Sequence, residues 1–182
     1  MADYKFYMQR VYQGENGTRT MDSKVYDLEA DFKGLKYKSL VGASQYGKPK
    51  GVYTESFSED KAVLAYVDPK GERAQTDITL NLYFLDPKKW GGTGTGTTPY
   101  ERMNALYHSF VETFKNCYVI YHDTARKRYI YMYMEDAHSV SADRLIGLQY
   151  IECQFKFKNV YGQTFANSTD IDINIGVEHK KA

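Results

Sequence analysis

Hydrophobic and polar residues alternate with a period of two in three segments of the chain. The clearest is Thr76–Phe84, where every second residue from Ile78 onward is apolar and the residues between them are mostly polar. The segments Gln149–Phe157 and Ile171–Val177 show the same alternation. Because successive side chains of a strand point to opposite faces of a sheet, this pattern predicts three half-buried antiparallel strands.

Shorter runs rich in Tyr, Phe and Val predict further strands, each bounded by Gly, Pro, Asn or Asp. These runs are Tyr4–Tyr12, Lys24–Phe32, Leu35–Val41 and Ala62–Val67. Two more, Cys117–His122 and Tyr129–Met134, flank a short segment that contains the basic sequence Arg126-Lys127-Arg128. We therefore predict a hairpin whose tip is a solvated basic turn, with a nucleic-acid-binding loop as the alternative.

A single amphipathic helix is predicted over residues 99–115. Thr98 is a suitable N-cap, Pro99 fits the first helical position, and Glu101 completes a capping box. The apolar stripe consists of Met103, Leu106, Tyr107, Phe110, Val111 and Phe114. The residues expected to remain in water are Arg102, Asn104, Glu112 and Lys115. We therefore expect one face of this helix to pack on a sheet.

The predicted elements run as strands, one helix and more strands, without the alternation of strand and helix that builds parallel sheets. We predict a mainly β (α+β) protein: an antiparallel β-sandwich or barrel flanked by one α-helix, with extended loops, in a single domain of residues 1–182. Two segments are expected to be irregular. Gly42–Thr54 is either an arm or a functional loop, and Gly91–Thr97 is a flexible linker.

Composition narrows the classes of function. The 24 Lys and Arg residues nearly balance the 23 Asp and Glu residues, and the net charge of +1 argues against a dedicated nucleic-acid binder. Cys117 and Cys153 are too few for a disulfide framework, so we expect free thiols. No run approaches the roughly 20 apolar residues of a membrane span, and the first residues lack the apolar core of a signal peptide. We therefore expect a soluble cytoplasmic protein without membrane contact.

No recognisable catalytic, cofactor or metal site emerges from the motifs. Gly91–Thr98 precedes the helix as a phosphate-binding loop would, but it lacks the lysine and the parallel-sheet context of such loops. The four histidines lack a metal-binding spacing, and His122 and Asp123 should face opposite sides of one strand. Asp170 and Asp172 could bind Ca²⁺ from one strand face, or form the solvated side of an edge strand. We predict that the protein is not an enzyme and uses no cofactor.

Tyrosine is unusually frequent, at 18 of 182 residues. Tyr129, Tyr131 and Tyr133 share one face of a predicted strand, while the residues between them are apolar as well. A strand that is apolar on both faces must be covered twice. Three kinds of cover remain open. The strand is covered by a second layer of the same chain, which includes the helix, or by another protein subunit, or by sugar rings that stack on exposed tyrosines.

The order of these elements resembles the phage tail-tube family and the related N-terminal domain of distal tail proteins. The resemblance rests on element order and composition, and it covers roughly residues 60–162. It is carried by the strand Thr76–Leu85, the helix Pro99–Lys115, the hairpin Cys117–Met134 and the closing strand Leu145–Tyr161. Residues 1–60 would be an N-terminal extension with an arm or long loop around residues 42–54. Residues 163–182 would add a C-terminal strand and tail.

The resemblance implies two packed antiparallel sheets with one helix, and a structural role in the virion. Subunits would self-associate into a hexameric ring and stack with other tail proteins, as part of a tail tube or tail-tip adaptor. DNA would pass through the lumen as a non-specific passenger, and assembly would take place in the cytoplasm of the bacterial host. The candidate subunit-interface residues are Tyr46, Lys48, Pro49, Tyr53, Thr93, Thr95, Tyr129, Tyr131 and Tyr133. The alternative function is a carbohydrate- or protein-binding β-sandwich module.

Overall fold

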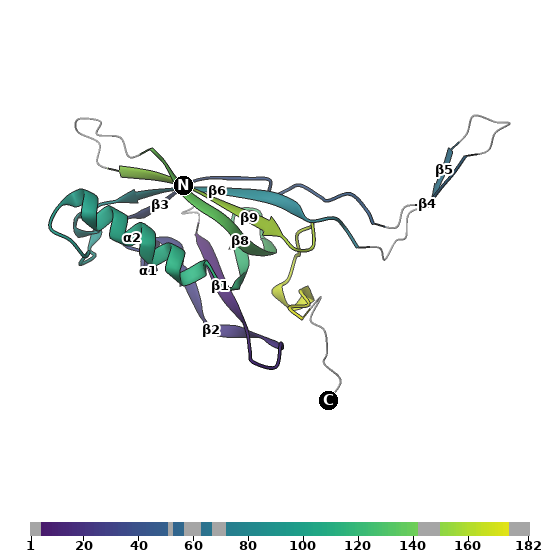
Figure 1. The fold of residues 1–182 in the computed structure, drawn as a ribbon, viewed down its shortest axis with the longest axis horizontal. Helices are drawn as coiled ribbons and strands as arrows, with labels where there is room; N and C mark the ends of the chain where they lie inside the picture. The colour runs from purple at the N-terminus through teal and green to yellow at the C-terminus, as the bar shows by residue number, and fades with distance from the viewer. Residues whose placement is uncertain (1–4, 51–52, 57–62, 67–71, 142–149, 175–182) are drawn as a thin grey trace.

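A seven-stranded antiparallel sheet forms the body of the protein (Figure 1). The computed structural model describes residues 5–50, 53–56, 63–66, 72–141 and 150–174. Within these residues the strand order is β2-β1-β7-β8-β9-β6-β3, and the sheet does not close into a barrel. The strands are β1 (Phe6–Gln13), β2 (Arg19–Asp27), β3 (Leu35–Val41), β6 (Thr76–Leu85), β7 (Tyr118–Asp123), β8 (Arg128–Ser141) and β9 (Tyr150–Asn159). The predicted mainly β, antiparallel fold with one flanking helix is confirmed.

Strands β6 and β9 form the longest unbroken ladder of the sheet, from the pair Thr76–Asn159 to the pair Leu85–Tyr150. Their inward side chains are the apolar positions of the alternating pattern, and all of them are buried. These side chains are Ile78, Leu80, Leu82, Phe84, Ile151, Cys153, Phe155 and Phe157. The period of two in the sequence therefore corresponds to the inner face of the sheet.

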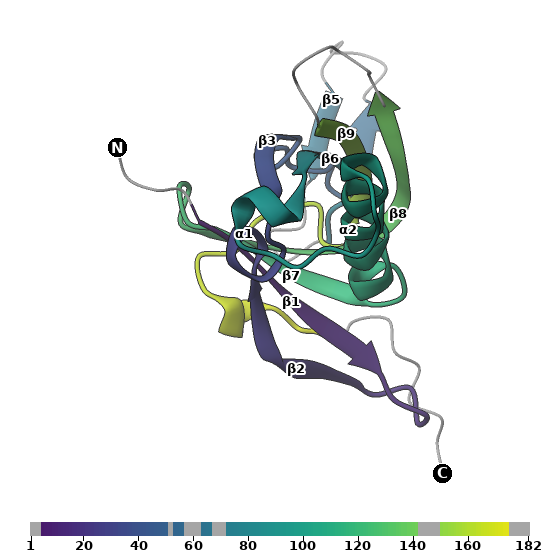
Figure 2. The same ribbon diagram turned by 90° about the vertical axis from the view of Figure 1, so that its left-hand side faces the viewer.

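Helix α2 (Pro99–Phe114) covers this inner face and packs on β6 and β9 (Figure 2). Its capping box is formed as predicted: Glu101 N–H donates to Thr98 Oγ1 (3.2 Å), and the Glu101 carboxylate accepts from Thr98 N–H (3.1 Å). Phe110 and Phe114 are fully buried, and the Phe110 ring lies 4.8 Å from that of Phe155. The apolar stripe of the helix and the inner face of the sheet thus form one core.

The predicted strand Lys24–Phe32 ends earlier than expected. Strand β2 stops at Asp27, and the short helix α1 (Leu28–Asp31) follows. The Asp27 side chain accepts a hydrogen bond from Ala30 N–H (3.2 Å), so a helix cap replaces strand pairing at this point. Leu28 and Phe32 then turn into the core, and Phe32 lies against the rings of Phe110 and Phe114.

The sheet curls strongly around its inner face. Phe6 of β1 and Tyr37 of β3 belong to strands far apart in the sheet order, yet their rings stack at a centroid distance of 3.9 Å. Helix α1 packs against β1, β2 and β3. The core is therefore enclosed by the sheet and both helices, although the strands do not form a closed ring of hydrogen bonds.

The outer face of the sheet carries a second, smaller cluster built on β1, β7 and β8. Val11, Ile120 and Tyr131 are buried there beneath a segment that follows β9 and includes Phe165, Ile171 and Ile173. This segment contains the 3-10 turn η2 (Ser168–Asp170). The cover of the second apolar face therefore comes from the same chain.

The prediction of a strand at Ile171–Val177 is wrong for residues 171–174, which are irregular, whereas residues 175–177 lie outside the described residues. The backbone carbonyl oxygens here accept hydrogen bonds from side chains rather than from a neighbouring strand. Tyr161 Oη donates to Asp172 O (2.7 Å), and Tyr131 Oη donates to Ile173 O (3.0 Å). Ile171 is buried and Ile173 is half-buried, and these apolar residues at alternate positions produced a strand-like pattern without a strand.

Candidate functional site

Between β3 and β6, the described residues 42–50, 53–56, 63–66 and 72–75 form an arm that extends from the sheet (Figure 1). Its far end carries β4 (Tyr53–Ser56) and β5 (Val63–Tyr66), which pair with each other in a separate two-stranded sheet. Figure 1 shows this hairpin well away from the seven-stranded sheet. The segment Gly42–Thr54 was predicted to be an arm or a loop. The structure places residues 42–50 in irregular backbone at the arm base and Tyr53 at the start of β4.

The two chain segments of the arm base are joined by backbone hydrogen bonds. Lys50 N–H donates to Glu72 O (2.7 Å), and Ala74 N–H donates to Lys48 O (2.8 Å). Gly47 N–H donates to Gly162 O (2.8 Å), which ties the arm to the segment after β9. A Cβ atom would lie 1.8 Å from Ala74 O at Gly47 and 2.0 Å from it at Gly162, so neither position has room for a side chain.

Three candidate residues, Tyr46, Lys48 and Pro49, lie at the base of the arm, and a fourth, Tyr53, lies at its far end in β4. Tyr46 is 54% exposed, and the guanidinium of Arg73 lies 5.4 Å from the centre of its ring. Lys48 is exposed, and Pro49 forms an isolated β-bridge with Arg73. Tyr53 pairs in register with Tyr66 of β5. These residues therefore share one appendage, as the sequence analysis assumed.

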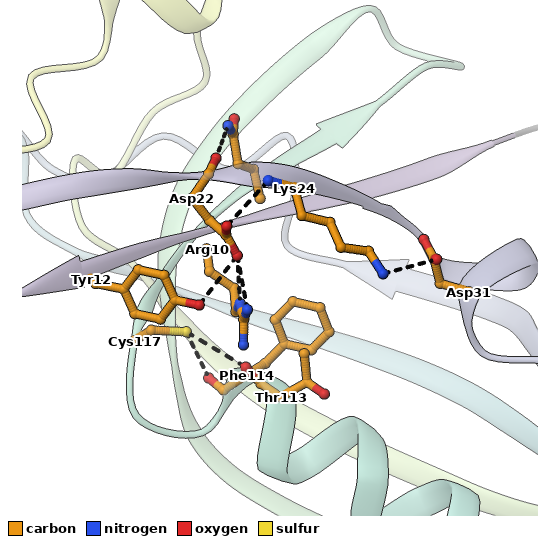
Figure 3. Close-up of polar contacts among 9 residues, drawn as sticks. Arg10, Tyr12, Asp22, Lys24, Asp31, Thr113, Phe114 and Cys117 are labelled. Atoms are coloured by element: carbon orange, nitrogen blue, oxygen red, sulfur yellow. Dashed lines mark hydrogen bonds and ion pairs between the residues drawn. The ribbon is translucent and has the colours of Figure 1, made fainter.

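At the opposite edge of the sheet, β2 is fastened to β1 by a cluster around Asp22 (Figure 3). One carboxylate oxygen of Asp22 accepts from Arg10 Nη2 (2.8 Å), Arg10 Nε (3.0 Å) and Tyr12 Oη (3.2 Å). The Arg10 guanidinium also lies about 5 Å from the rings of both Tyr12 and Tyr26. Hydrogen bonds from Lys24 N–H and from Arg10 hold the pKa of Asp22 below its usual value. This Asp22 cluster secures β2 where the β1–β2 register shifts.

Cys117 lies beside the same cluster (Figure 3). Its Sγ is 3.6 Å from Phe114 O and 3.9 Å from Thr113 O, at the end of α2. Burial raises the pKa of the Cys117 thiol, and burial likewise raises the pKa of Cys153 to about 12. Both cysteines are free, and neither has the low pKa of a reactive thiol.

The surface of β2 is a candidate that the sequence analysis missed. β2 is the terminal strand of the sheet, and Met21 and Val25 on it are 47% and 50% exposed. Val25 belongs to a segment that was predicted as a strand, but the pattern alone does not say which strand lies at an edge. Edge position depends on the pairing of distant segments, here β2 with β1 and β1 with β7.

The three tyrosines of β8 are not equivalent. Tyr131 is fully buried by its own chain, so its assignment as an interface residue is corrected. Tyr133 and Tyr129 are half-buried, and the Tyr129 ring stacks on His122 at 4.2 Å. Tyr7, His122 and Tyr129 follow one another in register across β1, β7 and β8. They line a shallow outer-face cavity of about 300 Å³ that also reaches Val25.

At the N-terminus of α2, backbone N–H groups that a phosphate would need are already bonded within the chain. The Glu101 carboxylate already accepts from Thr97 N–H (2.7 Å) and Thr98 N–H (3.1 Å). Thr93 and Thr95, the candidates in this segment, are exposed. The segment is therefore a connection to α2, and the place that an anion would take at the helix N-terminus is occupied by the carboxylate of Glu101.

The prediction that Arg102 remains in water is wrong. Its side chain is 9% exposed, and it forms two hydrogen bonds with the Asp86 carboxylate, Nε to Oδ1 (2.7 Å) and Nη2 to Oδ2 (2.6 Å). The Arg102 guanidinium, together with Lys88 N–H, holds the pKa of Asp86 below its usual value. This pair joins α2 to the 3-10 turn η1 (Pro87–Trp90). Of the other residues expected in water, Glu112 and Lys115 are exposed and Asn104 is half-buried.

The part of the chain that the structure describes contains no group of three or more His, Cys, Asp or Glu side chains suited to a metal ion. His122 faces the outer tyrosines, whereas Asp123 pairs with Arg126, so these neighbours point apart as predicted. Asp170 and Asp172 do not share a strand face, because their segment is irregular. Among the described helices, none is long and apolar enough to span a bilayer.

Comparison with known proteins leaves the chain without a family assignment. No family model matches the sequence, and no curated protein matches it either. The function must therefore be argued from the arm, the sheet edges and the surface of this chain.

Proposed function

We propose that this protein is a structural subunit of a phage or phage-derived tail, which assembles into rings through its arm and the edge of its sheet. The arm is the observation that carries the proposal. Its β4–β5 hairpin pairs only with itself among the described strands and lies apart from the body (Figure 1). An isolated two-stranded hairpin is at best marginally stable in water, so a neighbouring molecule is the natural partner for it.

The β2 edge supports the same proposal. A terminal strand presents unpaired backbone groups that can accept a further strand, and proteins normally protect such edges. β2 instead presents the exposed apolar side chains Met21 and Val25. An arm on one side of a subunit and an open edge on the other make a head-to-tail contact, which closes into a ring when the rotation between subunits allows it.

The resemblance to tail-tube proteins supplies the expected details. The ring would be hexameric and would stack with other tail proteins around a lumen that DNA crosses. The near-neutral net charge of +1 suits a channel that does not capture phosphates. Tyr46, Lys48, Pro49 and Tyr53 would contribute to the subunit contact from the arm, and Thr93 and Thr95 from the exposed connection before α2.

A second candidate function, a carbohydrate- or protein-binding module, rests on a different observation. The stacked rings of Tyr7, His122 and Tyr129 form an aromatic row that lines a cavity of about 300 Å³. A sugar ring would bind in this cavity against the aromatic side chains, and this function needs no self-association. A monomer that binds glycans would favour this candidate over the tail subunit.

The test is the assembly state of the purified full chain, measured by light scattering after size exclusion and by negative-stain electron microscopy. We expect rings or stacked tubes. A variant in which Lys50–Glu72 is replaced by a two-glycine turn removes both hairpin strands and keeps the backbone contacts of Lys48, Ala74 and Gly162. It should remain folded, with a thermal unfolding midpoint near that of the parent, and should lose the rings. A strictly monomeric parent protein, or rings that persist without the hairpin, would contradict the proposal.

A further inference from the structure

A cavity of about 210 Å³ lies where the arm joins the body. Its polar lining comes from three parts of the chain: the arm base, the β7–β8 turn and the segment after β9. The lining residues that carry polar side chains are Ser44, Tyr46, Asp123, Arg126, Arg128 and Thr164. Ile130, a residue of the main core, forms part of its floor. The cavity thus lies at one end of the inner face of the sheet, where the lining changes from apolar to polar side chains.

The charges around this cavity do not cancel. Asp123 is buried and forms an ion pair with Arg126, and it also accepts from Arg126 N–H (3.1 Å). Arg128 stands opposite Asp123 in the β7–β8 register, but its side chain has no hydrogen bond or ion pair within the described residues. The two arginines and one aspartate of the lining therefore leave one positive charge unpaired. Arg73, beside Tyr46, adds a further cation at the rim.

Polar atoms without partners are concentrated behind the same end of the inner face. Tyr121 Oη, Thr76 Oγ1 and Asn159 Oδ1 are buried and have no hydrogen-bond partner among the described residues. Tyr121 pairs in register with Ile130, and Asn159 pairs with Thr76 on one side and Met132 on the other. Buried polar groups almost always have a partner, so unsatisfied atoms grouped at one place indicate a site that holds a polar ligand or ordered water.

We propose that this cavity binds an oxyanion, a phosphate or carboxylate group, with Arg128 as its principal ligand. A guanidinium presents paired N–H donors that match two oxygens of either group, and such charge-assisted hydrogen bonds are among the strongest in proteins. The hydroxyl groups of Ser44, Tyr46 and Thr164 supply neutral donors from the other walls. Asp123 does not oppose the anion strongly, because Arg126 already neutralises it.

A bound oxyanion would connect the β7–β8 hairpin to the arm base, since Arg128 is the first residue of β8 and Ser44 and Tyr46 belong to the arm. The ligand would thereby fix the direction in which the arm leaves the body. This inference concerns the single chain and does not depend on ring assembly, so it holds for a tail subunit and for a binding module alike.

The experiment titrates the full chain into inorganic phosphate and follows the phosphorus NMR signal, which reports binding whatever the assembly state of the protein. Competition by acetate at constant ionic strength then separates the two chemistries. Acetate that displaces phosphate at equal or lower concentration identifies a carboxylate ligand, and weak displacement identifies a phosphate. Either result supports an oxyanion site. Absence of saturable binding of both probes at concentrations up to about 100 mM overturns it, because charge-assisted contacts to arginine should hold an anion more tightly than that.

Matched variants identify the residue responsible. Arg128→Gln should weaken phosphate binding about tenfold or more, and Ser44→Ala should weaken it by a smaller factor. Lys127→Gln makes the same change of charge at the neighbouring turn residue, which is exposed and does not line the cavity. It should change the affinity by no more than about twofold, because Lys127 makes no contact with the cavity and salt weakens the effect of an exposed charge. If Arg128→Gln and Lys127→Gln weaken phosphate binding equally, the binding is general electrostatic attraction, and the proposal is overturned. Circular dichroism confirms that each variant is folded.

Discussion

The two edges of the sheet are built differently. At the β3 edge, Glu29 of α1 accepts a hydrogen bond from Tyr37 N–H (3.4 Å), and the Tyr37 ring stacks on Phe6 of β1. A helix and an aromatic stack thus cover part of this edge. At the β2 edge, the Asp22 cluster faces the helix side of the sheet, and Met21 and Val25 remain exposed.

This difference indicates which edge is suited to a partner. Natural sheets protect their edges with charges, short strands or covering elements, because an unprotected edge pairs with other chains. In this protein α1 protects part of both edges, because Glu29 accepts from Tyr37 N–H of β3 and Asp31 accepts from Asp27 N–H of β2. What distinguishes β2 is its pair of exposed apolar side chains, Met21 and Val25. The Asp22 cluster also fastens β2 to β1, and a strand that is already ordered loses less entropy on association.

The largest expected effect comes from removing the Phe32 ring, which holds α1 against the core near the β3 edge. Phe32 follows α1 and contacts Phe110 and Phe114, with ring centroids 5.3 and 6.0 Å away. Phe32→Ala should lower the free energy of unfolding by about 3–5 kcal/mol, because it leaves a cavity between α1 and α2. Chemical denaturation measures the change. Tyr100→Ala, at a 54% exposed ring, is the control and should change stability by less than about 0.5 kcal/mol. A loss below about 1 kcal/mol for Phe32→Ala would mean that α1 is not anchored by this ring.

A matched pair of substitutions compares the two edges directly. Val25 on β2 and Val41 on β3 are 50% and 60% exposed. Val25→Lys should raise the concentration needed for assembly about tenfold or more, because it places a charge in the proposed docking edge, whereas Val41→Lys should leave assembly unchanged. Light scattering across a dilution series measures both. Stability should change little in either variant, and a larger effect from Val41→Lys would reverse the assignment of the docking edge.

The Asp22 cluster should make the β2 edge sensitive to acid. Asp22→Asn should lower the free energy of unfolding by about 1 kcal/mol at neutral pH, since the partly exposed pair with Arg10 is a charge-assisted hydrogen bond. The folded-state pKa of Asp22 lies below its unfolded value of about 3.9, so its contribution is present above that pH and is lost as the pH falls through the folded pKa. The free energies of unfolding of the two proteins should therefore approach each other as the pH falls below about 3.9. A difference that grew on acidification would contradict this account.

The smallest expected effect is at the β3 edge, where Glu29 contacts Lys36 and Tyr37. Glu29→Gln removes the ion pair with Lys36 (2.7 Å) and weakens the bond from Tyr37 N–H. Both side chains of the pair are about one-third exposed, so the loss in unfolding free energy should be about 0.5 kcal/mol or less. Glu112→Gln, which breaks the exposed pair with Lys115 on α2, is the control for a surface ion pair away from the edge. A large increase in self-association of Glu29→Gln alone would show that Glu29 protects the edge from pairing.

Local sequence signals predicted the regular elements well. The alternation of Thr76–Phe84 marked β6 and its buried face, and Thr98, Pro99 and Glu101 fixed the start of α2. Both signals depend on neighbours within a few residues, which is why they can be read without knowledge of the fold.

The errors of prediction involve distant partners. Arg102 was expected in water because its position on the helix lies off the apolar stripe. Its guanidinium instead donates two hydrogen bonds to the carboxylate of Asp86, which precedes η1. Tyr131 could not be assigned to a core or to an interface, because the covering residues Ile171 and Ile173 lie some forty positions further along the chain. For the same reason the cavity at the arm base has no sequence signature, since Ser44, Arg128 and Thr164 come from three separate segments.

At the arm base the backbones of Gly47, Ala74 and Gly162 lie in close contact, and this contact has a mechanical consequence for the arm. The close contacts there are made by peptide groups, with no side chain between them. A force that pulls on the β4–β5 hairpin is therefore transmitted through hydrogen-bonded backbone to β6 and β9, which lie within the sheet rather than at its open margin. Peptide groups cannot change rotamer under load as long side chains do. The appendage is therefore braced by β6 and β9, two strands inside the sheet, in addition to the edge strand β3 from which its chain leaves.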